Sequence, residues 1–521
     1  MRFPTLPAGD QIRQTVQTAF GGLNRSAGAE DGDLRDMRNL WSGDFPRLSV
    51  RPGRVTLGTL AKPNGLFTAG RRFTVDGTTL YVNGTSAGTV TDTPKVFAAL
   101  GDRVLIWPDK KAWSPEGGLV SLESSVTASC TFTDGTYAGE PAEGNTLRAA
   151  DSSFDWSAHF NVGDAVTISG AADGENNRTL IIREIDGNEL RFYEDSFTVS
   201  GTAADITVSR TVPDLDWLCV NENRVWGCRG DTIYASKLGD PRNWNVFDGL
   251  STDAWTWDTG TAGDFTGCVS FLGYPCFFKE RQIFKVYGDR PANFEPMGAP
   301  DLGVMAGCGR SLAVANETLF YLSRVGPMAY AGGVPRPIGT ELGDRLREGV
   351  GGSDGLRYCL SAKTSSGASR LYVYDALRQL WHIQDETEAL AFAPGAAGSV
   401  ECLTAAGTLW TTDGSASGTA EGAVSWYAEL GDYTRRSPNR KSLSKLLLRL
   451  EPGAGSSVSV LIRYDGQGDW VSVATVTGAG KGSRYLPVVP RRCDHFRLKL
   501  TGSGPCLLHS LTVESCEGSP N

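Results

Sequence analysis

The stretch RRFTVDGTTLYVNG, residues 71–84, alternates polar and apolar residues on both sides of an Asp-Gly pair. Alternation with a period of two is the pattern of a strand with one buried face. Asp-Gly and Asn-Gly are the preferred pairs of two-residue type I′ hairpin turns, and Asn83-Gly84 supplies a second turn. The stretch therefore predicts a meander of short antiparallel strands.

Similar units of three or four strands recur along the chain, about 30 to 45 residues apart where nothing intervenes. Such a sheet cannot bury both faces alone, whereas sheets packed face to face around an axis can. The pattern predicts a β-propeller of seven blades, or of six if the first and last units share one closing blade. The units begin at Arg72, Val96, Leu218, Cys268, Ser311, Arg357 and Ala389.

Two regions depart from the repeat. Between Ser121 and Arg210 the strands lack the aromatic blade pattern, which predicts a small β-barrel or sandwich inserted between the second and third blades. From about Ala423 the alternation is long and regular, which predicts a C-terminal β-sandwich of jelly-roll or immunoglobulin type. Helix-like patterns are confined to residues 9–18, 32–40 and 341–348.

The expected fold is thus all-β: a six- or seven-bladed propeller with an inserted β-barrel or sandwich and a C-terminal β-sandwich. The 521 residues divide into an N-terminal arm that leads into the first blade (1–55), blades one and two (56–120), the inserted domain (121–210), the remaining blades (211–420) and the C-terminal sandwich (421–521). The 64 glycines fall mostly in turn-like contexts, as expected of many short strands.

The formal net charge of −9 argues against a sequence-reading nucleic-acid binder, which normally presents a basic face. A mildly acidic wall would still let DNA slide past without sticking. The eleven cysteines form no CxxC pair and are interpreted as buried free thiols, typical of a protein made in a reducing cytoplasm. We see no signal peptide and no apolar run near the roughly 18 residues of a membrane helix.

Motifs of catalysis are missing from the sequence. The four histidines lie in no HxH, HxxxH or HExxH spacing, and neither a GxSxG elbow nor a P-loop occurs. We therefore expect no catalytic residue, no metal and no cofactor, and interpret His382 and His495 as structural or surface residues. Propellers do host glycosidases, whose paired carboxylates would lie near blade ends. The acids in such places are Asp301, Asp344, Asp375 and Glu388, but acids also cap blade turns.

A basic run near the start of the C-terminal region is a candidate contact loop for an acidic partner or for DNA phosphate. The alternative interpretation is a solvated loop between strands. Its residues are Arg435, Arg436, Arg440 and Lys441.

The N-terminal region carries a resemblance to a known family. Residues 20–26 read FGGLNRS, residues 45–53 read FPRLSVRPG, and later phrases include IYAS at 233–236 and FKVYGD at 284–289. In this order they resemble bacteriophage tail nozzle proteins (tail tubular protein B) and the podophage tail hubs called packaged-DNA stabilisation proteins. The likeness spans about residues 18–415 and leaves the 121–210 insert and the C-terminal sandwich unassigned.

The resemblance implies a structural virion protein, made in the host cytoplasm, that forms a ring, commonly of six copies, below the portal and adaptor. Such a ring encloses the DNA exit channel, helps retain DNA, and has further partners among tail fibre, spike or needle proteins. DNA would pass without sequence-specific binding, and no membrane is involved. The candidate oligomer or adaptor contacts are Phe20, Gly21, Gly22, Asn24, Asn39 and Arg51.

Two other hypotheses remain open. One is a glycan-binding or glycan-hydrolysing β-propeller with a carbohydrate-binding sandwich, which would need convergent carboxylates. The other is a cytoplasmic propeller scaffold for protein partners, which fits the blades but not the phage-like opening.

Overall fold

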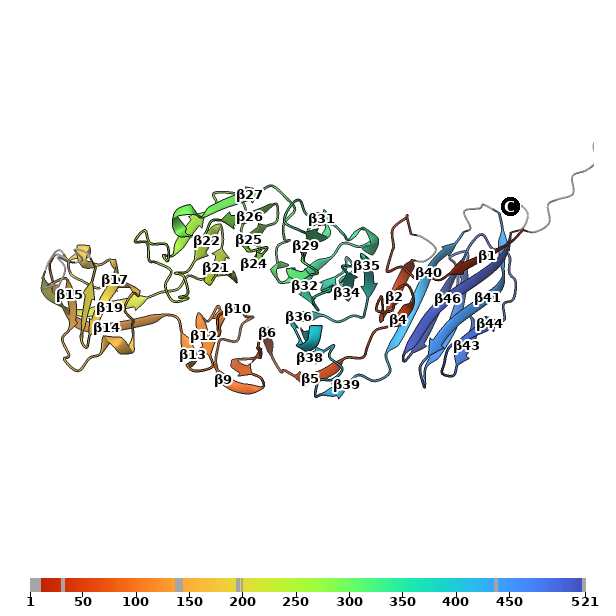
Figure 1. The fold of residues 1–521 in the computed structure, drawn as a ribbon, viewed down its shortest axis with the longest axis horizontal. Coiled ribbons are helices and arrows are strands. Elements are labelled where there is room, and N and C mark those ends of the chain that lie inside the picture. The colour runs from red at the N-terminus through yellow and green to blue at the C-terminus, as the bar shows by residue number, and fades with distance from the viewer. Residues whose placement is uncertain are drawn as a thin grey trace, which may run out of the picture. The chain divides into compact units, whose positions relative to one another are not determined.

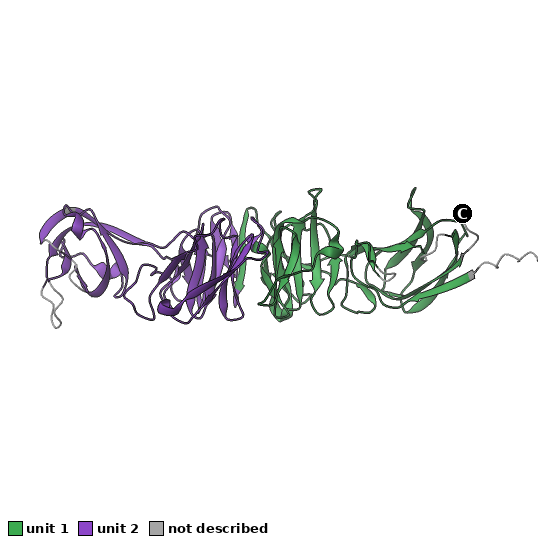
Figure 2. Ribbon diagram, turned by 90° about the horizontal axis from the view of Figure 1, so that it is seen from above, with its two compact units in different colours: residues 1–68, 310–521 green, residues 69–309 purple. Residues whose placement is uncertain are grey.

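The structure, a computed structural model, describes residues 11–29, 33–135, 144–193, 197, 200–434 and 439–517. These residues form two compact units, residues 1–68 with 310–521 and residues 69–309, drawn in two colours in Figure 2. Strands account for nearly all of the regular structure, and the few helical turns described are 3₁₀ turns of three residues. The all-β prediction is confirmed.

Seven antiparallel sheets of propeller-blade type follow one another among the described residues, six of four strands and the last of five. The first contains the stretch from which the fold was predicted, with Phe73 opposite Val82 and Asp76 opposite Thr79. Gly77 closes that hairpin at φ +57°, a conformation that favours glycine. The first two sheets comprise β6 (Pro63–Ala69), β7 (Arg71–Asp76), β8 (Thr79–Val82) and β9 (Thr85–Thr89), then β10 (Val96–Leu100), β11 (Arg103–Trp107), β12 (Lys111–Ser114) and β13 (Gly118–Ser121).

The middle sheets keep the same order, each strand paired with the next in sequence. They comprise β20 (Trp217–Asn221), β21 (Arg224–Arg229), β22 (Thr232–Ala235) and β23 (Trp255–Asp258); β24 (Gly267–Phe271), β25 (Tyr274–Lys279), β26 (Gln282–Tyr287) and β27 (Glu295–Ala299); β28 (Ala313–Ala315), β29 (Thr318–Ser323), β30 (Gly326–Tyr330) and β31 (Arg336–Pro337); and β32 (Arg347–Ser353), β33 (Arg357–Lys363), β34 (Ser369–Asp375) and β35 (Leu380–Ile383).

The last sheet takes a strand from the other end of the repeat. Its strands β36 (Ala389–Pro394), β37 (Val400–Thr404) and β38 (Thr408–Thr411) are followed by β5 (Val55–Thr59), which precedes the first sheet in sequence. β39 (Thr419–Ala420) completes the edge. The described residues therefore form seven such sheets, and the last one takes β5 from a distant segment. The first unit keeps a sheet of its own, so the first and last units do not merge into one closing blade.

The insert is a closed six-stranded barrel in the order β14-β15-β18-β17-β16-β19. Its core is apolar and includes Trp156, Phe160, Phe192 and Ile206, all buried. The barrel alternative is thus the one the chain adopts. Its strands are β14 (Ser124–Thr133), β15 (Thr146–Ala149), β16 (Ala165–Ser169), β17 (Thr179–Asp186), β18 (Glu189–Phe192) and β19 (Gly201–Arg210).

The C-terminal sandwich has two sheets, β3-β4-β46-β41-β44 with β1 also on β46, and β2-β40-β45-β42-β43. From β40 onward the chain crosses between the two sheets at every step except from β42 to β43, which is the strand order of a jelly roll, one of the two types expected. The strands are β1 (Gln11–Gln17), β2 (Leu34–Arg38), β3 (Leu40–Trp41), β4 (Leu48–Val50), β40 (Ser425–Tyr433), β41 (Lys441–Pro452), β42 (Ser457–Tyr464), β43 (Val471–Thr477), β44 (Gly482–Leu486), β45 (Phe496–Ser503) and β46 (Cys506–Glu517).

The sequence predicted an N-terminal arm that leads into the first blade, but the described strands of this region, β1 to β4, belong to the sheets of the C-terminal sandwich. Figure 1 shows the red β1, β2 and β4 beside the blue strands of the sandwich, and β2 pairs with β40 while β1 and β4 pair with β46. The helix-like patterns are also wrong: residues 11–17 and 34–38 are strands, and 341–348 contains the end of a 3₁₀ turn, Thr340–Leu342, and the start of β32. Pairing with a distant strand overrides local helix preference.

All eleven cysteines are free, nine of them buried, which confirms the interpretation as buried thiols. In the described part of the chain, no helix has the length and hydropathy needed to cross a bilayer. The same residues hold no group of three or more His, Cys, Asp or Glu side chains suited to a metal ion.

Candidate functional site

The N-terminal part of the family resemblance lies in a segment that supplies strands β2, β3 and β4 to the sandwich and also contacts the sheet β32–β35. We call residues 20–29 and 33–54 the joint segment. Leu23 donates its backbone N–H to the Trp381 carbonyl at 2.6 Å, and Asn39 donates to the Gln384 carbonyl at 2.8 Å. Strand β2 of the same segment pairs with β40 of the sandwich. The joint segment is therefore bonded to a blade and to the sandwich at once.

The Gly-Gly pair is explained by this close approach. A Cβ added at Gly22 would collide with the backbone oxygen of Trp381, and one at Gly21 would collide with the Asp33 carboxylate. Phe20, just before the pair, is buried and donates its N–H to the Pro46 carbonyl at 2.9 Å. Glycine is thus required at Gly22 because two backbones touch.

Asn24 and Asn39 organise the polar part of the joint segment. The Asn24 amide donates to Asp33 Oδ2 at 2.8 Å and its Oδ1 accepts from Ser26. Asn39 adopts φ +57°, donates Nδ2–H to the Ser425 carbonyl at 2.8 Å and accepts from Arg51 Nε at 2.8 Å. Asparagine tolerates the left-handed region better than most residues.

Arg51 is buried and its two terminal nitrogens donate to the two carboxylate oxygens of Glu421, at 2.7 and 2.8 Å. Burial by itself would raise the pKa of Glu421, but hydrogen bonds from Arg51 and from the Arg54 backbone hold the pKa below its ordinary value. A bidentate pair of this kind fixes geometry as well as charge.

Four of the six predicted contact residues are therefore buried within one chain. Phe20, Gly22, Asn39 and Arg51 make their contacts within the subunit's own fold, while Gly21 and Asn24 are half-buried. The role of these six residues as oligomer or adaptor contacts stays a prediction.

Arg54 continues the network toward the last sheet. Its Nη1 donates to Asp385 at 2.6 Å, its Nη2 donates to Gln384 at 2.6 Å, and its guanidinium stacks on Trp410 with 4.1 Å to the ring centroid. Burial lowers the pKa of Arg54, against the opposing influence of Asp385. The stacked, paired guanidinium is a rigid element.

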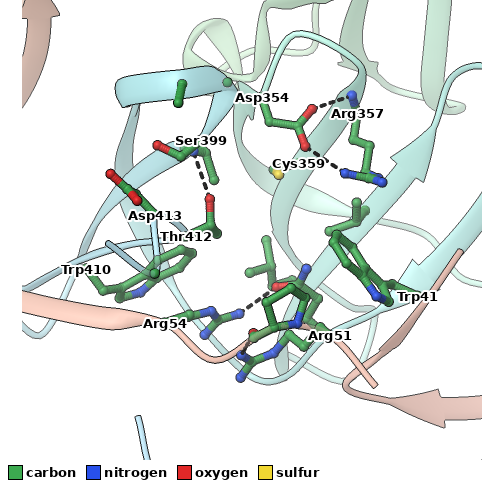
Figure 3. Close-up of a pocket in the computed structure, with 18 of the residues that line it drawn as sticks. Trp41, Arg51, Arg54, Asp354, Arg357, Cys359, Ser399, Trp410, Thr412 and Asp413 are labelled. Atoms are coloured by element: carbon green, nitrogen blue, oxygen red, sulfur yellow. Dashed lines mark hydrogen bonds and ion pairs between the residues drawn. The ribbon is translucent and has the colours of Figure 1, made fainter. Parts of the chain in front are cut away.

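A cavity of about 290 Å³ opens beside this network, between the joint segment and the sheets that contain β33 and β37 (Figure 3). Trp41 lies under Arg357, with 4.4 Å from the guanidinium carbon to the ring centroid, while Trp410 lies under Arg54. Figure 3 shows the two indoles on opposite sides of the view, each beside its arginine. The cavity is thus bordered by two cation–π pairs.

Turns from neighbouring sheets complete the wall. The turn after β36 supplies Ala396, Ala397, Gly398 and Ser399, the loop after β38 supplies Asp413 and Gly414, and the turn after β32 supplies Asp354. Arg357 pairs with Asp354 at 3.1 Å.

Some polar atoms on this wall have no protein partner. They are Ser399 Oγ, Arg54 Nε and Arg357 Nε, each shielded from solvent. A buried polar atom without a partner costs free energy and calls for a bound molecule or water.

The basic candidate loop is only partly described. Arg435 and Arg436 lie outside the described residues, and Arg440 is exposed. Lys441 is buried at the start of β41, where its ammonium donates to the Asp494 carbonyl. Lys441 is therefore wrong as a surface contact residue, because its charge stabilises the sandwich interior.

The candidate acids of the glycosidase hypothesis serve other purposes. Asp375 accepts from Ser42 at 2.5 Å and pairs with Arg378 at 2.9 Å; burial would raise its pKa, but these partners keep the pKa low. Burial would also raise the pKa of Asp344, but hydrogen bonds from Ser365 and Arg345 keep it lowered. A general acid needs the opposite shift. The other two acids are Glu388, exposed and 3.5 Å from Lys363, and Asp301, half-buried.

Trp41, Arg54, Arg357 and Trp410 were not singled out from the sequence. They come from positions far apart in the chain, in four different strands and loops, so no local motif contains them. The signal that could have been followed is the Arg-Pro-Gly-Arg run at 51–54, two arginines inside a turn before a buried strand.

Comparisons with known proteins find only distant structural matches. No family model matches the chain, and no curated protein matches it significantly. Among solved structures, BamB from Moraxella catarrhalis is 11% identical, matching 69% of this chain and 97% of its own, with a TM-score of 0.34.

An exo-beta-1,3-galactanase from Phanerochaete chrysosporium, solved with galactose, is also 11% identical over 56% of this chain and 92% of its own, with a TM-score of 0.23. Likeness at these scores supports no conclusion about fold or function. The strand pairing of the chain itself shows an all-β protein with many antiparallel four-stranded sheets.

Proposed function

We propose that this chain is a structural protein of a bacteriophage tail, of the nozzle or hub type. It assembles with copies of itself into a ring below the portal and adaptor, and the ring encloses the exit path of the DNA. The sequence resemblance, spread over residues 18–415, is the source of this proposal, and the geometry of the joint segment is the observation that supports it best.

The geometry of the joint segment suits a protein that is under mechanical load. Residues that carry the resemblance bond one sheet of the sandwich to the end of the sheet β32–β35 through backbone hydrogen bonds at Leu23 and Asn39. The Arg51–Glu421 pair fixes the same segment to the residues just before β40. A connection made by buried, paired groups bends less than a single linker, because each bond must break before the parts move. A tail component under pressure from packaged DNA needs such a connection.

The acids also favour a role without turnover. Asp344 and Asp375, near blade ends, are kept ionised by hydrogen bonds and an ion pair. A glycosidase requires one carboxyl group that stays protonated near neutral pH. Hydrolysis is therefore the weaker proposal.

Self-association tests the proposal. Purified chain would be followed by light scattering after size-exclusion chromatography, and by negative-stain microscopy alone and with a portal–adaptor complex. We expect ring-shaped particles of about six copies, alone or on the portal complex, as symmetric homo-oligomers form. The proposal is contradicted if the purified chain stays monomeric and does not bind the portal–adaptor complex.

A further inference from the structure

The cavity beside the joint segment carries its positive charges in matched pairs. Arg51 is bound by Glu421, Arg54 by Asp385 and Arg357 by Asp354. Each guanidinium on the wall is therefore already neutralised by a carboxylate. A second acid, Asp413, lies on the same wall.

This balance selects against a charged ligand. An anion entering the cavity would compete with Glu421, Asp385 and Asp354 for the guanidinium groups. A cation would meet three arginines at close range. Unpaired like charges in a partly desolvated site weaken binding strongly, so a neutral ligand is favoured.

The polar side chains on the wall define what the neutral ligand must offer. The guanidinium groups of Arg54 and Arg357 are donors. Asp413 and Asp354 add acceptors. A molecule with several hydroxyl groups satisfies such a mixture, because each hydroxyl is donor and acceptor at once.

The remaining wall is apolar. Trp41, Trp410, Leu371, Val373 and Val400 line it, and the two indoles are held by the arginines stacked on them. A volume of about 290 Å³ lies at the lower end of small-molecule pockets, which span about 300–1,000 Å³. A ring with polar edges and C–H faces fits both the size and the mixture of surfaces.

From this geometry we infer that the cavity is a binding site for one neutral sugar ring of a glycan. The inference goes beyond the ring-forming role proposed above and does not depend on it. It concerns binding alone and involves no bond cleavage.

Saturation-transfer NMR with full-length protein tests the inference. The neutral probes are methyl α-D-glucopyranoside, methyl β-D-galactopyranoside and N-acetyl-D-glucosamine; D-glucuronate and D-glucosamine are the charged ones. Gly414→Phe plugs the cavity, because Gly414 lines it and an added Cβ there meets nothing within 4 Å. Gly333→Phe is the matched control: Gly333 is equally open, has an exposed backbone and lies outside the cavity wall.

We expect at least one neutral probe to bind wild type and Gly333→Phe alike, with a Kd in the millimolar range, and to bind Gly414→Phe at least about tenfold more weakly. The inference is overturned if no neutral probe binds below about 50 mM. Binding of only a charged probe, or equal binding by Gly414→Phe, also overturns it. Unchanged circular dichroism of each variant shows that the fold is intact.

Discussion

The inserted barrel and the C-terminal sandwich are both β modules, but they draw their strands from the chain in different ways. All six barrel strands lie within residues 124–210, and the barrel core is apolar. The sandwich instead takes β1 to β4 from the N-terminal part of the chain and pairs β1, β2 and β4 with strands near the C-terminus. One module is local, whereas the other exists only once the two ends of the chain have met.

The difference also appears in the polar groups. The joint segment beside the sandwich buries Arg51, Arg54 and Asn39 among partners far away in sequence. In the barrel, the Arg148–Glu189–Arg191 cluster lies at the surface side of the strands, with Arg148 62% exposed. Long-range polar pairing specifies which ends meet, while a local module is specified well enough by its apolar pattern.

The largest expected effect comes from removing residues 1–50. Without β1 to β4 the sandwich loses an edge of each sheet and the joint segment is broken, so we expect loss of cooperative unfolding in this region, equivalent to more than about 5 kcal/mol. Near-UV circular dichroism and hydrogen exchange would measure it. The fragment 121–212 is the counterpart, since it should fold alone with a sigmoidal melt. A truncated chain with wild-type exchange in β40–β46 would contradict the contrast.

Phe192→Ala tests the barrel by the same logic. Phe192 is 1% exposed in the apolar core, and emptying its site should cost about 3–5 kcal/mol. The unfolding of the barrel should shift while the sandwich stays unchanged by hydrogen exchange. The neighbouring, exposed residue supplies the control, because Tyr193→Ala should cost less than about 1 kcal/mol. Equal losses of stability from Phe192→Ala and Tyr193→Ala would contradict the role of Phe192 in the barrel core.

Arg51→Ala should destabilise unit 1 by about 2–3 kcal/mol, because Glu421 would keep a partly buried carboxylate without its cation. Urea denaturation would measure the loss, and a cycle with Glu421→Gln would isolate the pair. Arg47→Ala, which removes an exposed pair with Asp44 at 3.6 Å, should change stability by less than about 0.5 kcal/mol. A loss at Arg51 no greater than at Arg47 would contradict the role given to the buried pair.

His382 gives unit 1 a pH dependence. Burial lowers the pKa of His382 to about 4, below the ordinary value near 6.5, so the folded state binds the proton less readily than the unfolded state. Stability is therefore complete above about pH 6.5 and falls as the pH drops toward 4, by about 2 kcal/mol between pH 7 and pH 5. Urea midpoints across this range would show it. In His382→Phe, the dependence of stability on pH should become weaker. An unchanged dependence would mean that other titratable groups cause it.

The smallest effect is expected at the barrel surface. Arg148→Ala removes an exposed guanidinium, and Glu189 keeps Arg191 at 2.9 Å, so the cost should be about 0.5 kcal/mol. Thermal unfolding of the fragment 121–212 would measure it. A loss as large as that expected for Arg51→Ala would mean that the barrel, too, depends on its polar pairs.

Much of the fold could be predicted from local pattern. The Asp76-Gly77 turn and the alternation around it specify a hairpin whatever the rest of the chain does, and the same holds for each later blade. The barrel region was recognised because its strands are close in sequence. The helix-like patterns misled because residues 11–17 and 34–38 are edge strands, whose state is decided by β46 and β40.

The candidate site could be predicted far less well. The sequence singled out Asn39 and Arg51, yet their partners Ser425 and Glu421 lie in a distant part of the chain. Trp41, Trp410 and Arg357 line the same cavity. The sequence around each of them contains no pattern that predicts its proximity to the other two.

By itself, then, the amino-acid order determined that the chain is made of short antiparallel strands and where they turn, because turn chemistry and period-two burial act over a few residues, while it left the number of blades at six or seven. Only the tertiary structure decided that β5 completes the last sheet, that β1 to β4 belong to the sandwich, and which charges face each other around the cavity. Those outcomes depend on contacts between distant segments, whose free energy is set by packing in three dimensions and leaves no local trace.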